Sequence, residues 1–172
     1  MITADVSMGS LAAPLPTTVE RIWEVNVDNY PRTVCHCKGV TYIGLNEGKV
    51  CKIDYQQSKS ASEFVQLNNY IVGIIAHLDR LYILERGSPY AVFVYDLHGK
   101  QLHKWNFVYQ SDLTANAMAI VGDQLLLADN TNACIAIYSL NGEKQRSIPC
   151  SLIRKEYDSL CGCGPDAVVI AH

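Results

Sequence analysis

The 172-residue sequence lacks the features that would mark a membrane protein or a secreted protein. No apolar run approaches the roughly 20 residues that a membrane-spanning helix needs, so we expect no membrane partner. Residues 1–15 are mildly apolar but carry no Lys or Arg ahead of the apolar stretch, which argues against a secretory signal. We therefore expect a cytoplasmic protein.

Catalytic signatures are missing as well. The sequence contains no Gly-x-Ser-x-Gly, which forms the nucleophile elbow of many hydrolases. The five histidines are scattered, and none has a neighbouring Ser or Cys in such a sequence. We expect that this chain by itself is not an enzyme.

A strong excess of one charge is also absent. The net charge is −3, and the basic residues are spread along the chain rather than clustered. This leaves no general attraction to phosphate backbones or to anionic membranes.

Seven cysteines are present, an odd number that does not form a dense disulfide scaffold. Without a secretory signal, we expect reduced, partly buried thiols. Cys35-His36-Cys37 and Cys161-Gly162-Cys163 contain the residue types of a zinc site. Their Cys-x-Cys spacing puts both thiols on one face of a strand, whereas structural zinc sites usually use wider turns. We interpret the thiols as packing groups and expect no metal or other cofactor; a metal site and a disulfide are the alternatives.

What the sequence does contain is an internal repeat. Residues 80–85 and 91–100 resemble residues 124–129 and 134–143. Equivalent positions are 44 residues apart at Leu81 and Leu125, and 43 apart at Gly99 and Gly142. A fixed period of about 40–50 residues built from short strands is typical of the blades of a β-propeller.

Large apolar residues outside those segments keep the same period. They are Trp23, Phe64, Trp105 and Ile148, with separations of 41, 41 and 43 residues. The series predicts one equivalent strand in each repeat, whose large side chain fills the wedge between neighbouring sheets.

The repeat divides into short strands rich in β-branched and aromatic residues, separated by polar or Gly-containing turns. We predict an all-β fold, a partial β-propeller of four-stranded antiparallel blades, and a type I′ turn at Asn141-Gly142. Residues 19–172 would form this domain after a disordered lead-in at 1–18. Its expected parts are a leading outer strand at 21–25, full blades at about 33–67, 71–107 and 115–148, and a partial blade at 159–172.

Residues 126–132 followed by residues 135–143 resemble an NHL repeat, the blade unit of six-bladed propellers at the C-terminus of many tripartite-motif (TRIM) proteins. The position of Asp129 is taken by Glu85 in the second repeat and by Leu45 in the first. The resemblance covers about residues 20–172. It implies a fragment of a six-bladed ring, whose open blade edges allow self-association; a four-bladed ring is the alternative.

The resemblance also implies a function. The parent protein would be a RING-type E3 ubiquitin ligase, and this part would recognise its substrate proteins. The catalytic zinc-binding modules would lie N-terminal to it, so this chain would not itself transfer ubiquitin.

Glu85 and Asp129 stand at matching repeat positions, just before a loop. In propeller lactonases and hydrolases, acidic residues of this kind hold a divalent cation, which makes a metal-dependent enzyme the alternative function. The interpretation that we favour is that each carboxylate accepts hydrogen bonds from backbone N–H groups of its own turn.

Recognition is expected on the propeller face that collects the loops between the second and third strands of each blade and the loops between blades. The candidate binding residues there are Tyr30, Tyr70, Arg86, Tyr90, Tyr109, Asp129, Asn130 and Asn132. Tyr30, Tyr70 and Tyr109 recur at intervals of 40 and 39 residues, so packing at blade junctions is an equal alternative. Tyrosine, asparagine and serine suit protein contacts; RNA, stacked on loop tyrosines, is the other partner considered.

Overall fold

The computed structural model describes residues 26–27, 29–57, 60–107, 115–150, 153, 159–162 and 168–171. Strands and turns make up this part of the chain, and no helix in it could span a membrane. The lead-in expected at residues 1–18 and the strand expected at 21–25 lie outside the described residues, so the division into domains stays a prediction.

Three four-stranded sheets follow one another along the chain, each with its strands in sequence order and antiparallel. The first sheet holds β1 (Pro31–Cys37), β2 (Val40–Leu45), β3 (Lys49–Asp54) and β4 (Ser62–Gln66). The second holds β5 (Tyr70–His77), β6 (Arg80–Arg86), β7 (Ala91–Asp96) and β8 (Gln101–Asn106). The third holds β9 (Ala115–Val121), β10 (Gln124–Asp129), β11 (Cys134–Ser139) and β12 (Lys144–Pro149). A further pair consists of β13 (Ser159–Gly162) and β14 (Val168–Ala171).

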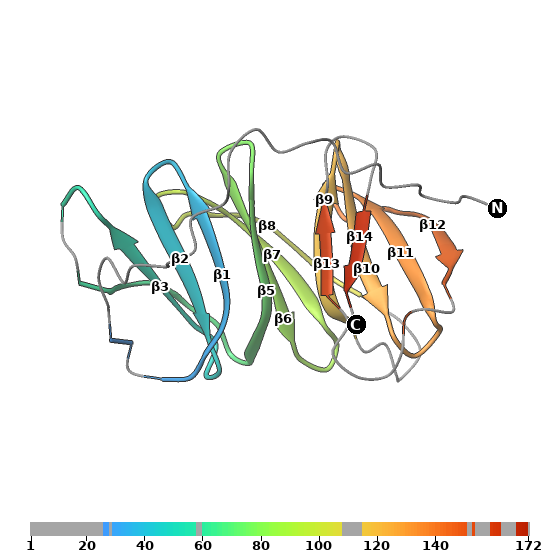
Figure 1. The fold of residues 1–172 in the computed structure, drawn as a ribbon, viewed down its shortest axis with the longest axis horizontal. Helices are drawn as coiled ribbons and strands as arrows, with labels where there is room; N and C mark the ends of the chain where they lie inside the picture. The colour runs from blue at the N-terminus through green and yellow to red at the C-terminus, as the bar shows by residue number, and fades with distance from the viewer. Residues whose placement is uncertain are drawn as a thin grey trace, which may run out of the picture.

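The sheets stand side by side across the molecule, from β1–β4 on the left to β9–β14 on the right (Figure 1). Their first strands are neighbours, because β1 contacts β5, β5 contacts β9, and β9 contacts β13. Four-stranded sheets whose innermost strands adjoin in this way are the blades of a propeller. The predicted all-β partial propeller is therefore confirmed, and we call the sheets the first, second and third blades.

The middle strands of the second and third blades are buried on both faces. Five consecutive residues are buried in each of β6, β7, β10 and β11, whereas every residue of the outermost strand β12 is exposed. Because another blade covers each face, these strands have no need for alternating apolar and polar residues. This explains the continuous apolar runs in the sequence.

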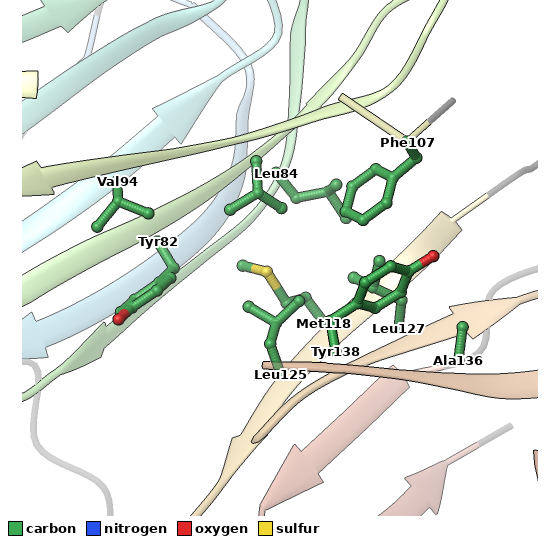
Figure 2. Packing of buried hydrophobic residues seen from close by; sticks show 10 residues of the cluster. Tyr82, Leu84, Val94, Phe107, Met118, Leu125, Leu127, Ala136 and Tyr138 are labelled. Atoms are coloured by element: carbon green, nitrogen blue, oxygen red, sulfur yellow. The ribbon is translucent and has the colours of Figure 1, made fainter. Parts of the chain in front are cut away.

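The core consists of layers between neighbouring blades. Figure 2 shows Leu84 and Phe107 of the second blade facing Met118 and Leu127 of the third, and Tyr82 belongs to the same cluster. A similar cluster joins the first and second blades, and another joins the third blade to β13. Since burying one large apolar side chain contributes about 1.5–3 kcal/mol, these layers hold the blades together.

The predicted series of large residues falls on equivalent strands, as expected. Phe64 lies on β4, Trp105 on β8 and Ile148 on β12, while Trp23 lies outside the described residues. Phe64 and Trp105 each lie against a turn glycine of the next blade, Gly99 and Gly142 respectively. Ile148 is 42% exposed at the end of the third blade.

The type I′ turn predicted at Asn141-Gly142 is wrong. Only Gly142 has a positive φ, 90°, and its N–H donates to the Ser139 carbonyl while the Ser139 N–H bonds to the Glu143 carbonyl. A three-residue loop with its glycine in a left-handed conformation is a type I turn with a bulge. Turns with positive φ at both central residues lie instead at Lys38-Gly39 and at Leu78-Asp79.

Candidate interaction surface

The loops predicted to carry recognition lie at one edge of the blades, which we call the loop face. It contains the β2–β3, β6–β7 and β10–β11 loops, the β4–β5 connection, and the residues just before β1. The opposite edge, which we call the turn face, carries the β1–β2, β5–β6 and β9–β10 turns and the turns that follow β3, β7 and β11. Antiparallel strands in sequence order place these two sets of connections at opposite ends of each blade.

A β-bulge displays Arg32 on the loop face. Pro31 pairs with Leu45 and Thr33 with Gly44, so Arg32 is the extra residue of β1. The second and third blades have the same irregularity at Val72 and Asn116. Because a bulge bends the strand and re-aims a side chain, it explains why an arginine is tolerated on an inner strand.

Two contacts fix the exposed Arg32 side chain. Its Nε donates a hydrogen bond of 2.9 Å to the Asn46 Oδ1, and its guanidinium carbon lies 5.8 Å from the centre of the Tyr70 ring. The Asn46 N–H in turn donates to the Tyr30 carbonyl at 3.1 Å. Arg32 thus connects the β2–β3 loop of the first blade to the start of the second.

Tyr70 and Arg86 belong to the second blade, where Tyr70 lies next to Arg32. They are paired at the ends of β5 and β6, so their Cα atoms lie directly opposite each other. Tyr30 is 80% exposed and Tyr70 is 48% exposed, and the Arg86 side chain is also exposed. We call Tyr30, Arg32, Tyr70 and Arg86, with Asn46 as support, the Arg32 cluster.

Tyr90 lies beside Arg86 at the end of the β6–β7 loop. Burial raises the pKa of its hydroxyl, and the positive charge of Arg86 partly offsets that rise. The side chain is half-buried and packs against the core between the second and third blades. Tyr90 therefore supports the loop more than it contributes exposed surface.

Glu85, beneath the Arg32 cluster, holds the connection between the first two blades. Its Oε1 accepts hydrogen bonds of 2.9 Å from the backbone N–H groups of both Asn68 and Asn69. The side chain is 4% exposed. The expectation that Glu85 caps its own turn is therefore wrong, because this longer carboxylate reaches the β4–β5 connection that precedes Tyr70.

Asp129 does cap its own loop, as expected. Its carboxylate accepts hydrogen bonds from the Asn132 N–H at 3.1 Å and from the Asn132 Nδ2 at 2.7 Å. Asp129 and Asn130 are 3% and 4% exposed, whereas Asn132 is exposed. The first blade has the fully buried Leu45 at the equivalent position, so these sites do not form a ring of oxygen ligands.

The cysteine motif of β1 belongs to the core. Cys35 and Cys37 pack against the apolar cluster between the first and second blades. Burial, and then the neighbouring Cys37, raise the pKa of the Cys35 thiol to about 12, so it stays protonated at neutral pH. Among the described residues, no group of three or more His, Cys, Asp or Glu side chains is placed to hold a metal ion.

The structure thus groups Tyr30, Tyr70 and Arg86 on one part of the loop face, next to Tyr90. Asn132 lies in the corresponding loop of the third blade, and Tyr109 falls outside the described residues. The sequence interpretation missed Arg32 and Asn46 as part of this surface. One signal was present, because Arg32 stands where the second repeat has the apolar Val72.

No protein-family model and no curated protein matches the chain. Solved structures do match, among them the computationally designed Ika4 protein, with a TM-score of 0.60 and 13% identity over 86% of this chain and 96% of that one. The β-propeller domain of Myceliophteria thermophila Cps50 (Swd1) has a TM-score of 0.59 and 13% identity over 81% of this chain and 50% of that one. Virginiamycin B lyase from Staphylococcus aureus has a TM-score of 0.60 and 11% identity over 78% and 46%.

At these identities the likeness shows the fold alone, which is that of a β-propeller. The chain spans about half the length of the Cps50 domain and of the lyase. Membership of the NHL type stays a prediction.

Proposed function

We propose that this chain is a protein-interaction module that binds a partner protein through the loop face of its propeller. The observation that carries the proposal is the Arg32 cluster, which places two exposed tyrosines and two exposed arginines on one part of that face. Tyrosine and arginine are enriched where proteins bind one another, because each offers a large contact area together with a polar group.

The rigidity of the surface supports the same proposal. Glu85 fixes the β4–β5 connection, and Asn46 and Tyr70 fix Arg32, so these side chains lose little freedom when a partner binds. Binding loops carried on a packed sheet scaffold are the usual arrangement for recognition.

We further propose a substrate-recognition role within a larger cytoplasmic protein. The NHL-like residues 126–143 support a parent of the tripartite-motif type, in which a RING module would transfer ubiquitin and this chain would only select the substrate. The flanking coding sequence tests this: upstream RING and B-box sequences would support it, and their absence would remove the ligase context.

A metal-dependent lactonase or hydrolase is the competing class of function. Its two candidate metal ligands, Glu85 and Asp129, give it little support. Asp129 has both oxygens engaged by Asn132, and Glu85 is engaged by two backbone N–H groups. Their hydrogen bonds give each carboxylate a structural role within the loops.

Position-specific photo-crosslinking tests the proposed function. A benzophenone amino acid would replace Tyr70 on the loop face and, as a matched control, Leu78 on the turn face, which is 77% exposed. In an extract of the cells that express the protein, we expect discrete crosslinked partners from position 70 and none of these from position 78. The same products from both positions, or none from position 70, would contradict the proposal.

A further inference from the structure

We infer that the Arg32 cluster binds an acidic segment of the partner protein, with carboxylates placed against Arg32 and Arg86. This inference rests on the proposed function and specifies the chemistry of the ligand. Its first support is that, among the described residues, neither guanidinium forms an ion pair, although other cations do, such as Lys38 with Asp79.

The geometry of Arg32 is the second support. The Nε hydrogen bond to Asn46 and the position of the guanidinium carbon over the Tyr70 ring restrict the orientation of the guanidinium. Among the described residues, none accepts a hydrogen bond from its Nη groups. A restrained guanidinium with its Nη groups open is suited to a carboxylate, which it binds through parallel hydrogen bonds.

The third support is that Arg32 differs in character from the residue at the same bulge position in the other blades. In the second blade the corresponding Val72 is half-buried and packs into the core between blades. Each of the three described blades has this bulge, and only in the first blade is the extra residue charged. A feature confined to one blade is not explained by repeat packing.

The surroundings favour an acidic peptide over RNA. Exposed Glu47 stands next to Asn46 in the same loop, and the chain carries a net charge of −3. Single-stranded nucleic acid needs a continuous basic track along its backbone, which two arginines flanked by a carboxylate do not provide. A peptide with one or two acidic side chains matches the charge of the cluster and can lay an apolar side chain against the exposed Tyr30 ring.

Selection from a library of short randomised peptides tests the inference with the 172-residue chain. The variants are Arg32→Gln and Arg86→Gln, with Arg80→Gln as control, because Arg80 is exposed at the turn-face end of β6, the strand that ends in Arg86. We expect Asp and Glu to be enriched in peptides selected by the unmodified chain and by Arg80→Gln. We expect the enrichment to be lost in the other two variants.

Affinities of a selected acidic peptide give the second readout. Loss of one charge-assisted hydrogen-bonding partner should weaken binding about tenfold in Arg32→Gln and in Arg86→Gln, and leave Arg80→Gln unchanged. Arg32→Lys should recover part of the loss, since it keeps the charge but not the planar group. Thermal melting of each variant verifies that it is folded.

Other results would overturn the inference. Selected peptides without acidic enrichment, acidic binding that is indifferent to both substitutions, or no selected peptides at all would refute the acidic ligand, while the crosslinking from position 70 still decides the proposed function. A short oligouridine that binds more tightly than any acidic peptide, and that loses binding in Arg32→Gln, would identify RNA as the ligand instead.

Discussion

The two edges of the blades both use a carboxylate to accept backbone hydrogen bonds, but the hydrogen bonds join different parts of the chain. On the turn face, Asp96 accepts hydrogen bonds from the N–H groups of His98 and Lys100, so the carboxylate and its partners belong to one turn. On the loop face, Glu85 reaches the connection from the preceding blade, and the Arg32 guanidinium of the first blade lies over the Tyr70 ring of the second. Asp96 stabilises a single turn, whereas Glu85 and Arg32 join the first blade to the second and build a surface that both blades share.

The turn face offers a matched pair of glycines that should show the largest effect. Gly142 and Gly99 have φ values of 90° and 91°, so an added side chain strains both backbones equally. A Cβ on Gly142 would lie 2.5 Å from the Trp105 Cγ, whereas one on Gly99 would lie 3.5 Å from its nearest neighbour, the Phe64 carbonyl oxygen.

We therefore expect Gly142→Ala to destabilise the fold by about 3 kcal/mol and Gly99→Ala by about 1 kcal/mol. Urea unfolding of the two variants measures the difference. Equal losses would show that Trp105 does not fill the wedge between the second and third blades.

On the loop face, Glu85→Ala should be the most damaging substitution of the described residues that support the Arg32 cluster. It leaves the N–H groups of Asn68 and Asn69 without their acceptor, and we expect a loss of about 2 kcal/mol. Glu85→Gln keeps an acceptor oxygen and should lose less. Hydrogen exchange of the Asn68 and Asn69 amides provides the local readout, and unchanged exchange in Glu85→Ala would refute the contact.

The contribution of Asp96, the carboxylate that caps a turn on the turn face, to the stability of the fold should depend on pH. The backbone N–H groups of Lys100 and His98 lower the pKa of Asp96, so the folded protein favours the ionised form. This stabilisation is present above the unfolded pKa of about 3.9 and is lost as the pH falls through the lower folded value.

Comparison of the unmodified chain with Asp96→Asn tests this. The melting temperature of the unmodified chain should be slightly higher than that of Asp96→Asn at about pH 6. This difference in melting temperature should disappear below about pH 3. A gap that stays constant over this range would show that the charge of Asp96 does not matter.

The smallest effect on stability is expected at the Arg32 cluster itself. Arg32 and Arg86 are exposed, so Arg32→Gln and Arg86→Gln should change the free energy of unfolding by less than about 0.5 kcal/mol. Urea unfolding measures it. A loss of unfolding free energy as large as that of Glu85→Ala would mean that these arginines hold the blades together. That result would contradict the interpretation of the surface as a binding site.

The fold could be predicted from the sequence because a repeat states the same pattern several times. The series Phe64, Trp105 and Ile148 placed one equivalent strand in each blade, and Phe64 and Trp105 lie where one blade meets the next. Turn geometry was harder: Asn141-Gly142 suggested a two-residue turn, but one additional residue in the loop changed its type.

The surface was predicted only in part, because its members come from different repeats. Tyr30, Tyr70 and Arg86 could be placed on the loop face from topology alone. The role of Arg32 depends on a bulge, on Asn46 and on the ring of the next blade, none of which the sequence specifies locally. The same limit explains Glu85, whose partners lie 16 and 17 residues earlier in the chain.

The claim that recognition takes place on the loop face is tested most directly by mapping a bound acidic peptide onto the backbone amides with NMR. The account predicts that the amides perturbed by the peptide are those of residues 30, 32, 46–48, 68–70 and 85–87, while the turn-face residues 78–80, 97–100 and 141–143 are unaffected. Perturbations confined to the turn face, or spread evenly over both faces, would contradict it.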